Sequence, residues 1–373
     1  MTASVQELKH LQRNALSRPS RETSEFRTDD ILWLDKNENM DPEYQAFLQN
    51  LIADLPSKAL FGYPDCHALY KKLGHYLDVP INQLMIAAGS DGVIRAVYEA
   101  FVTSGDTVIY TNPTFAMYEV YSKITGAKAI ELNYEVSANG PLLIVERLVQ
   151  AILENTPRLV CIPNPNSPSG TVFSPDELYR IIETAHDVGA VILIDEAYHP
   201  FYGETVLPLI AKFPQLIVAR SFSKAWGCAG IRLGYGIASK AVTDMLHKIR
   251  PMYEAGALSI MIAERLLDNT EQMLNSVRRL NEGKEYFLSE MRLLGFHTLN
   301  AEGNFLHVAF GKKADAVHKV LSDKVLYRQN FSHPSLVGYS RFSATTKEVF
   351  ASVVEWISST VIPAQAGIHS LQP

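Results

Sequence analysis

The residue with the clearest chemical potential is Lys224, which follows Ser223 and precedes a run of small residues. Its amine could form an imine with a carbonyl compound. Upstream, Asp195 ends a strongly apolar run, so its carboxylate should be buried and should need a cationic partner. Ser221, Ser223 and Arg232 could bind phosphate oxygens through two hydroxyls and a guanidinium. Together these residues suit a ligand with an aldehyde, a protonated ring nitrogen and a phosphate.

Pyridoxal 5′-phosphate combines these three groups, and the sequence therefore predicts it as the cofactor. Each residue alone has another explanation. Lys224 alone would be an exposed surface lysine, and Asp195 alone could cap a helix or pair with an arginine elsewhere in the chain. The combination carries the prediction, because few chemistries need all of these groups at once.

Other candidate residues follow the predicted strands. Gly89 to Gly92 lie between a strand and a helix, where backbone amides can bind a phosphate or simply form a tight turn. Phe115 could stack on a flat ring or belong to the core. Asn166 lies in a segment rich in Asn and Pro, which is either a rigid turn or the source of an amide donor to a phenolate oxygen. Tyr198 could contact the same ligand as Asp195.

Composition limits the function classes. The chain has 373 residues, 47% of them hydrophobic and 20% charged, with a net charge of −6, which is enough for a large core and two domains. The sequence shows no basic run, no signal-like segment and no membrane-spanning stretch, so we expect no nucleic-acid or membrane partner and a cytoplasmic location. Three widely spaced cysteines and no tight ligand spacing predict reduced thiols and no metal site.

From residue 81 onward, short apolar runs alternate with amphipathic stretches. The predicted strands are 84–87, 107–110, 128–132, 159–162, 191–194, 216–219 and 233–237. Apolar strands covered by helices predict an α/β fold with a mainly parallel sheet, whose ligands bind at the carboxyl ends of the strands. A long helical stretch reaches about Leu293, and a smaller α+β unit follows. The predicted divisions are an N-terminal arm (1–33), a large domain (34–250), a small domain (251–360) and a disordered tail (361–373).

From about Leu34 to Ser358 the sequence resembles the fold-type I pyridoxal-phosphate enzymes, and among them the aminotransferases close to histidinol-phosphate aminotransferase. The resemblance implies an aspartate aminotransferase-like fold with a seven-stranded-type sheet and a smaller α+β C-terminal domain. It also implies a homodimer with shared active sites, a role in amino-acid biosynthesis, glutamate as a donor and a small 2-oxo or phosphorylated carbonyl compound as acceptor.

The same resemblance assigns roles to individual residues. At the coenzyme phosphate it implies Ser90, Asp91, Gly92, Ser221, Ser223 and Arg232, together with Tyr63 from the neighbouring subunit. It implies that Phe115 stacks on the coenzyme ring, that Asn166 and Tyr198 contact the phenolic oxygen, and that Asp195 contacts the ring nitrogen. Lys224 is implied to form the imine. Those implied for the substrate are Asn37 near it, Arg341 at an α-carboxylate and Arg328 at a phosphate. Lys224, Asp195 and Tyr198 are the implied catalytic residues.

The sequence also departs from the family pattern. Asn166 to Gly170 reads Asn-Ser-Pro-Ser-Gly where the family has Asn-Asn-Pro-Thr-Gly, and Asn164 and Ser167 remain alternatives for the ring contact. Met40 replaces a usual proline. These changes suit an altered amino donor or acceptor. Two other functions stay open: decarboxylation of a phosphorylated amino acid on the same fold, and a coenzyme-binding regulatory module, which the lack of a basic helix-turn-helix segment before Leu34 disfavours.

Overall fold

The apolar runs predicted as strands pair into one seven-stranded sheet in a computed structural model that describes residues 27, 28 and 30–361. From edge to edge the order is β2 (Leu84–Ala87), β10 (Gly234–Ala238), β9 (Leu216–Ser221), β8 (Val191–Asp195), β7 (Leu159–Pro163), β3 (Thr107–Asn112) and β4 (Lys128–Asn133). β10 runs antiparallel to both of its neighbours, β2 and β9, and all other neighbouring strands of this sheet pair in parallel. The predicted α/β fold with a mainly parallel sheet is confirmed.

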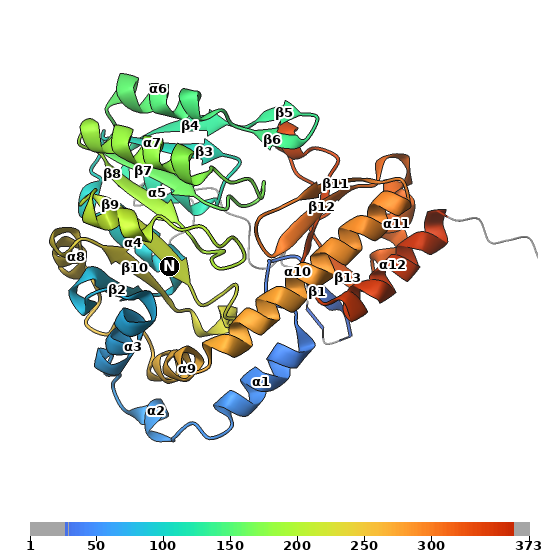
Figure 1. Cartoon of the computed structure of the whole chain (residues 1–373), viewed down its shortest axis with the longest axis horizontal. Coiled ribbons are helices and arrows are strands. Elements are labelled where there is room, and N and C mark those ends of the chain that lie inside the picture. The colour runs from blue at the N-terminus through green and yellow to red at the C-terminus, as the bar shows by residue number, and fades with distance from the viewer. Residues whose placement is uncertain (1–26, 29, 362–373) are drawn as a thin grey trace, which may run out of the picture.

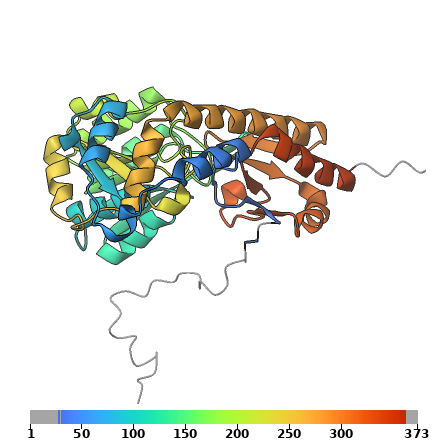
Figure 2. The same ribbon diagram turned by 90° about the horizontal axis from the view of Figure 1, so that it is seen from below.

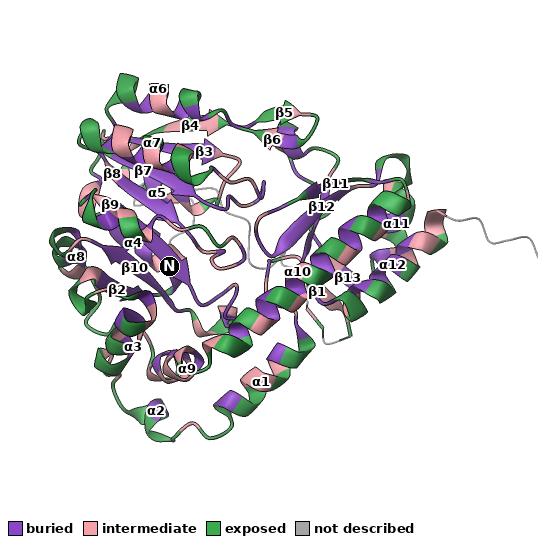
Figure 3. Cartoon of the chain, in the orientation of Figure 1, coloured by how far each residue is buried: buried purple, intermediate pink, exposed green. Residues whose placement is uncertain are grey.

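Helices cover both faces of this sheet, because successive side chains of each strand point to opposite sides. Ile194 and Val218 pack on one face, and Leu193 and Ala219 pack on the other. The first face is covered by α3 (His67–Leu77), α6 (Val145–Asn155), α7 (Pro175–Asp187) and α9 (Ala257–Leu267). The second face is covered by α4 (Gly89–Phe101), α5 (Met117–Thr125) and α8 (Lys240–His247). The strands are accordingly buried along most of their length, except the edge strand β4, whose residues are exposed or half-buried (Figure 3).

A smaller unit lies beside the large sheet, and the long helix α10 (Thr270–Leu293) runs from one unit to the other (Figure 1). Its elements are the antiparallel sheet β11 (His297–Asn300), β12 (Phe305–Ala309) and β14 (Ser340–Ser343), the parallel pair β1 (Leu32–Leu34) and β13 (Val325–Tyr327), α11 (Ala314–Leu321) and α12 (Lys347–Val361). The N-terminal strand β1 therefore pairs within the C-terminal unit. This pairing brings the residues after β1 close to the junction of the two units.

The remaining elements lie at the edges of these two units. They are α1 (Pro42–Ile52), α2 (Lys58–Phe61), the hairpin β5 (Glu135–Ser137) and β6 (Gly140–Leu142), and the short 3-10 helices 81–83, 207–211, 229–231, 311–313 and 334–336. The view from below shows α1 crossing the junction of the two units (Figure 2). Contacts of α1 with α9 and α10 hold it there.

The predicted domain boundaries stay predictions. Ile260 and Ala263 of α9 and Met273 of α10 belong to the hydrophobic cluster of the large sheet, although they follow residue 250. Most of the predicted arm (1–33) and nearly all of the predicted tail (361–373) lie outside the described residues. Within residues 27–361, apart from residue 29, no helix is both long and apolar enough to span a bilayer.

Candidate active site

The carboxyl ends of two neighbouring parallel strands bring the main candidate residues together. Asp195 is the last residue of β8, and Ser221 is the last residue of β9. Asp195 pairs in register with Ala219, which packs on the α4 and α5 face. Because side chains alternate along a strand, Asp195 and Ser221 both face the side of the sheet that α4 and α5 cover. Lys224 lies in the turn that follows β9, so it lies at the same edge of the sheet.

Asp195 is a buried carboxylate without a cation. Only 5% of the residue is exposed, and its Oδ2 and Oδ1 accept hydrogen bonds from Tyr118 Oη and the Ala197 amide, each at 3.1 Å. In the described part of the chain, no lysine, arginine or histidine forms an ion pair with it. Burial raises the pKa of Asp195 to about 6, and the two hydrogen bonds act in the opposite direction. A protonated ring nitrogen would supply the missing cation.

The start of α4 forms a possible phosphate site. The helix begins at Gly89 with a φ of +81°, and no side chain caps its first amides. A Cβ on Gly234 would lie 2.6 Å from the Ser90 nitrogen, so only glycine lets β10 approach this turn. A Cβ on Gly89 would lie 3.0 Å from Arg232 Nη2, and Ser221 pairs in register with Gly234. Uncapped amides, a hydroxyl and a guanidinium thus surround one helix start, which fits a phosphate group.

Neighbouring residues of α4 and of the turn after β9 complete this region. Asp91 accepts a hydrogen bond from Tyr121 Oη at 2.9 Å, and Gly92 follows it in the first turn of α4. The Ser223 amide donates to Ser221 Oγ at 3.0 Å. The turn between β9 and Lys224 is therefore fixed by the same hydroxyl that faces the start of α4.

Lys224 reaches the segment that follows β1. Its Nζ donates to the carbonyl oxygens of Lys36 and Asn37 at 3.0 and 3.1 Å, and it lies 5.7 Å from the centre of the Tyr198 ring. Asn37 Nδ2 donates to Tyr198 Oη at 2.8 Å. The structure thus places the predicted residues Lys224, Tyr198 and Asn37 in one cluster.

The segment around Asn166 lies beside the residues that follow β3. Asn166 Nδ2 donates to Pro113 O at 2.9 Å, and its Oδ1 accepts from Thr114 Oγ1 at 3.1 Å. The alternative Asn164 instead uses both ends of its side chain on the Phe173 backbone. Phe115 is 39% exposed and contacts Tyr118 edge-on at 6.2 Å. Of the two asparagines, Asn166 is the one that contacts the segment carrying Phe115.

The small unit contributes two arginines. Arg341 is 7% exposed, its Nη2 donates to the Asp35 carbonyl at 2.7 Å, and its guanidinium lies 5.4 Å from the centre of the Phe305 ring. Arg328 pairs with Arg341 through an isolated antiparallel bridge and is exposed. Burial lowers the pKa of Arg341 below its usual value, and the charge of Arg328 acts in the same direction. Because a buried charge is costly without a partner of opposite charge, we expect Arg341 to bind an anion.

Several buried polar atoms at this junction have no hydrogen-bond partner among the described residues. They are Asn37 Oδ1, Asn304 Oδ1, Arg341 Nε and both ring nitrogens of His307. Buried polar groups in folded proteins are nearly always paired, so a cluster of unpaired ones indicates a place for a polar ligand or water. The sequence analysis did not single out Asn304, His307 or Tyr118. Tyr118 lies one helical turn after Phe115, which is the only local signal that could have identified it.

Tyr63 does not join the cluster within one chain. It is 82% exposed and stacks on Tyr253, with ring centres 4.4 Å apart. Leu60 and Phe61, shortly before it in the chain, and Met252, next to Tyr253, are also exposed. The structure therefore places this residue on an apolar outer surface.

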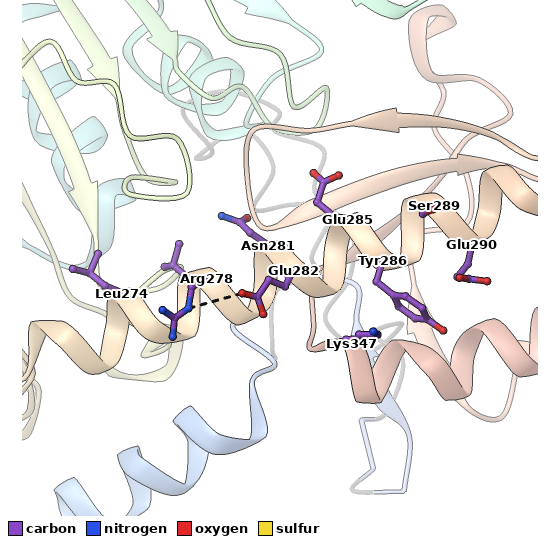
Figure 4. Close-up of a pocket in the computed structure, with 10 residues that line it drawn as sticks. Leu274, Arg278, Asn281, Glu282, Glu285, Tyr286, Ser289, Glu290 and Lys347 are labelled. Carbon is purple, nitrogen blue, oxygen red and sulfur yellow. Dashed lines mark ion pairs between the residues drawn. The ribbon is translucent and has the colours of Figure 1, made fainter.

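A surface hollow lies away from these residues. It follows the outer side of α10, where Arg278 and Glu282 form an ion pair and Lys347 contributes from α12 (Figure 4). None of the candidate residues lines it, and it is open to solvent, so we do not assign the reaction to it. Among the residues that the structure describes, no three His, Cys, Asp or Glu side chains are grouped to hold a metal ion.

Comparison with known proteins agrees with this geometry. The family model for aminotransferase class I and II matches residues 29–357. A histidinol-phosphate aminotransferase from Caldanaerobacter subterraneus subsp. tengcongensis is 35% identical over 293 residues, which cover 77% of this chain and 80% of that protein.

Two solved structures share the fold. The histidinol-phosphate aminotransferase from Sinorhizobium meliloti, solved with pyridoxal-5′-phosphate, superposes with a TM-score of 0.76 at 18% identity, covering 93% of this chain and 98% of that one. The L-threonine-O-3-phosphate decarboxylase from Porphyromonas gingivalis superposes with a TM-score of 0.73 at 20% identity, covering 88% and 99%. At these identities the likeness shows the fold alone, and the aspartate aminotransferase-like architecture predicted from the sequence is confirmed.

Proposed function

Because this chain belongs to the class I and II aminotransferases and is a pyridoxal 5′-phosphate-dependent transaminase, we propose that it transfers an amino group between glutamate and a phosphorylated carbonyl compound. The phosphorylated partner is histidinol phosphate and its keto form, by similarity to the relatives named for that substrate. We include the cytoplasmic location and the absence of nucleic-acid and membrane partners in this proposal.

The coenzyme would be held at both of its ends. The amides of Ser90, Asp91 and Gly92, together with Ser221, Ser223 and Arg232, would hold its phosphate, and Asp195 would hold its ring nitrogen. Phe115 would stack on its ring, and Asn166 and Tyr198 would contact its phenolic oxygen. When bound, the coenzyme supplies an aldehyde for the amino group and a ring that withdraws electrons from the substrate Cα.

The chain's own residues supply charge, a base and orientation. The Asp195 carboxylate, which lacks a cation in its buried position, stabilises the protonated form of a ring nitrogen next to it. Lys224 Nζ is the group to accept and return the proton of the substrate Cα. Tyr198 is oriented by the hydrogen bond from Asn37, so its hydroxyl is fixed beside the lysine. These three residues are therefore the proposed catalytic residues.

The observation that carries the substrate proposal is the position of the two arginines. Arg341 binds the segment that also receives Lys224, since Asp35, Lys36 and Asn37 provide the carbonyl oxygens for the two side chains. An anionic group bound by Arg341 therefore lies close to the reacting amine. Arg328, paired through its backbone with Arg341, adds a second cation for a substrate phosphate.

A direct assay tests this function. The purified protein with pyridoxal 5′-phosphate, histidinol phosphate and 2-oxoglutarate should form glutamate, and Arg341→Ala should raise the KM for glutamate far more than the KM for an uncharged amine. Carbon dioxide release from phosphothreonine without glutamate formation would contradict transamination and support the decarboxylase. Equal losses with both donors would show that Arg341 does not bind the carboxylate.

We propose in addition that two chains form a homodimer with shared active sites. The support is the exposed apolar surface formed by Leu60, Phe61, Tyr63, Met252 and Tyr253. Apolar patches of this kind usually mark a protein interface, and Tyr63 would reach the coenzyme phosphate of the partner. Light scattering should give the mass of a dimer, and Phe61→Asp should produce monomers with little activity. A wild-type monomer with full activity would contradict the shared site.

A further inference from the structure

Three basic side chains form one row across the small unit. His307 on β12 pairs in register with Arg341 on β14, and Arg341 pairs with Arg328 through the next bridge. Residues directly opposite each other in antiparallel strands point to the same face. The neighbouring pair, Leu306 and Phe342, belongs to the core of the small unit, so the row faces the other way, toward the large unit.

His307 is buried, and no hydrogen bond of normal geometry reaches either of its ring nitrogens from the described residues. Its ring is surrounded by Phe305, Phe331 and Tyr339, with ring centres 5.7 to 6.4 Å away. Burial, together with the charges of Arg341 and Arg328, lowers its pKa to about 3, and the Pro168 backbone acts in the opposite direction. The ring is therefore neutral at pH 7, and one of its nitrogens is a free acceptor.

Arg341 carries the complementary unpaired donor. Its Nε is also buried without a partner, while Nη2 donates to the Asp35 carbonyl. A guanidinium fixed at Nε and at one Nη presents its remaining N–H groups in a single direction. A neighbouring neutral acceptor would fix Nε without competing for the anion, whereas a carboxylate in its place would neutralise the arginine.

We propose that His307 is a positioning residue for Arg341: a ring nitrogen accepts the Nε–H of Arg341 when an anionic substrate binds, and this contact sets the preference for amino donors that carry an α-carboxylate. The inference rests on the proposed role of Arg341. His307 is fully buried, so it acts through the arginine and does not touch the substrate.

The test compares two variants with two amino donors. His307→Leu removes the acceptor, and His307→Gln keeps one at similar length. Since a hydrogen bond to a charged group is lost, the leucine variant should raise the KM for glutamate about tenfold at an almost unchanged kcat. The KM for an uncharged primary amine should not change, and the glutamine variant should remain near the wild type. The absorbance of the bound coenzyme should be the same in all three proteins.

A double-mutant cycle with Arg341→Lys shows whether the effect passes through Nε, because lysine has no equivalent donor. In that background His307→Leu should have no further effect on the KM for glutamate. Additive effects, equal losses in the leucine and glutamine variants, or equal losses with both donors would overturn the role of His307.

If the leucine variant does not fold, His307→Asn serves in its place, because the amide is too short to reach Nε. Failure of the proposed function has a different signature: the wild type itself would not transaminate any amino acid.

Discussion

The buried carboxylate of Asp195 makes a testable prediction about the coenzyme-free protein. The residue is 5% exposed and has no cationic partner, and its pKa rises from 3.8 to about 6 on folding. The folded state binds this proton more tightly than the unfolded state does, so the protonated carboxyl contributes to the free energy of unfolding. This contribution is fully present below pH 3.8 and is lost as the pH rises to about 6. At about 1.4 kcal/mol per pH unit, the ionised carboxylate destabilises the coenzyme-free protein by about 3 kcal/mol above pH 6.

Asp195→Asn removes this destabilisation and retains part of the hydrogen bonding. The carboxylate accepts from the Tyr118 hydroxyl and the Ala197 amide through two oxygens, but asparagine has only one side-chain oxygen. The variant therefore loses one of these hydrogen bonds, which lowers the free energy of unfolding by about 1 kcal/mol. The net result should be a coenzyme-free variant that is about 2 kcal/mol more stable than the wild type at pH 8. The advantage should disappear near pH 4, where the wild-type carboxyl is protonated.

Thermal unfolding of the coenzyme-free proteins from pH 4 to pH 8 measures this difference, with the exposed Asp54→Asn as the control. Added pyridoxal 5′-phosphate should reverse the order, because only the carboxylate stabilises a protonated ring nitrogen, and ligand binding raises stability in proportion to the logarithm of affinity. A variant that is less stable than the wild type without coenzyme at pH 8, or a difference that does not change with pH, would refute the reasoning.

Three further changes have defined outcomes. Lys224→Ala should abolish transamination and the adduct that borohydride traps between coenzyme and protein, and a trapped adduct in the variant would contradict the assignment. Gly170→Ala would put a Cβ 2.2 Å from that of Ala301 at a φ of +76°, so it should destabilise the protein by about 2–4 kcal/mol; Gly189→Ala, with a φ of +77° and no atom within 4 Å, should lose only about 1 kcal/mol in the same unfolding experiment. Tyr118→Phe removes the hydroxyl donor to the buried carboxylate and should change coenzyme affinity about fivefold in a spectroscopic titration, whereas an unchanged affinity would show that this hydrogen bond is not used.

The large sheet was predictable because its signal is local. Most of the seven strands are short apolar runs bounded by turn residues, and alternate side chains of these runs fill the two halves of the core. The edge strand β4 instead alternates apolar with charged or polar residues. The same rule placed Asp195 at a strand end, since a polar residue that ends an apolar run has reached the edge of the sheet. Ser221 was predicted as a hydroxyl near Lys224, and the structure shows that β9 extends to it. The family resemblance then supplied the remaining coenzyme residues, which no local pattern distinguishes from ordinary turns.

The contacts that join the two units had no such signal. Tyr118 and Asp195 are 77 positions apart, and Asn37 and Ser343 are 306 positions apart, so each pair depends on how distant segments pack. The row of His307, Arg341 and Arg328 depends on strand register, and a shift of one residue would turn all three side chains to the other face. A short strand rich in apolar residues gives no sign of its register.

The segment between β1 and α1 connects residues of the two units in the proposed site. Its main chain receives Lys224 from the large unit at residues 36 and 37, and Arg341 from the small unit at residue 35. Asn37 adopts a φ of 55°, donates its amide N–H to Ser343 Oγ and its side chain to Tyr198. Other side chains of this segment are fixed as well: Asp35 and Glu38 pair with Arg27, Asn39 donates to the Ala225 carbonyl and to Ser276 Oγ, and Asp41 pairs with Arg279. At position 37, asparagine tolerates the left-handed conformation and also supplies the donor that Tyr198 needs.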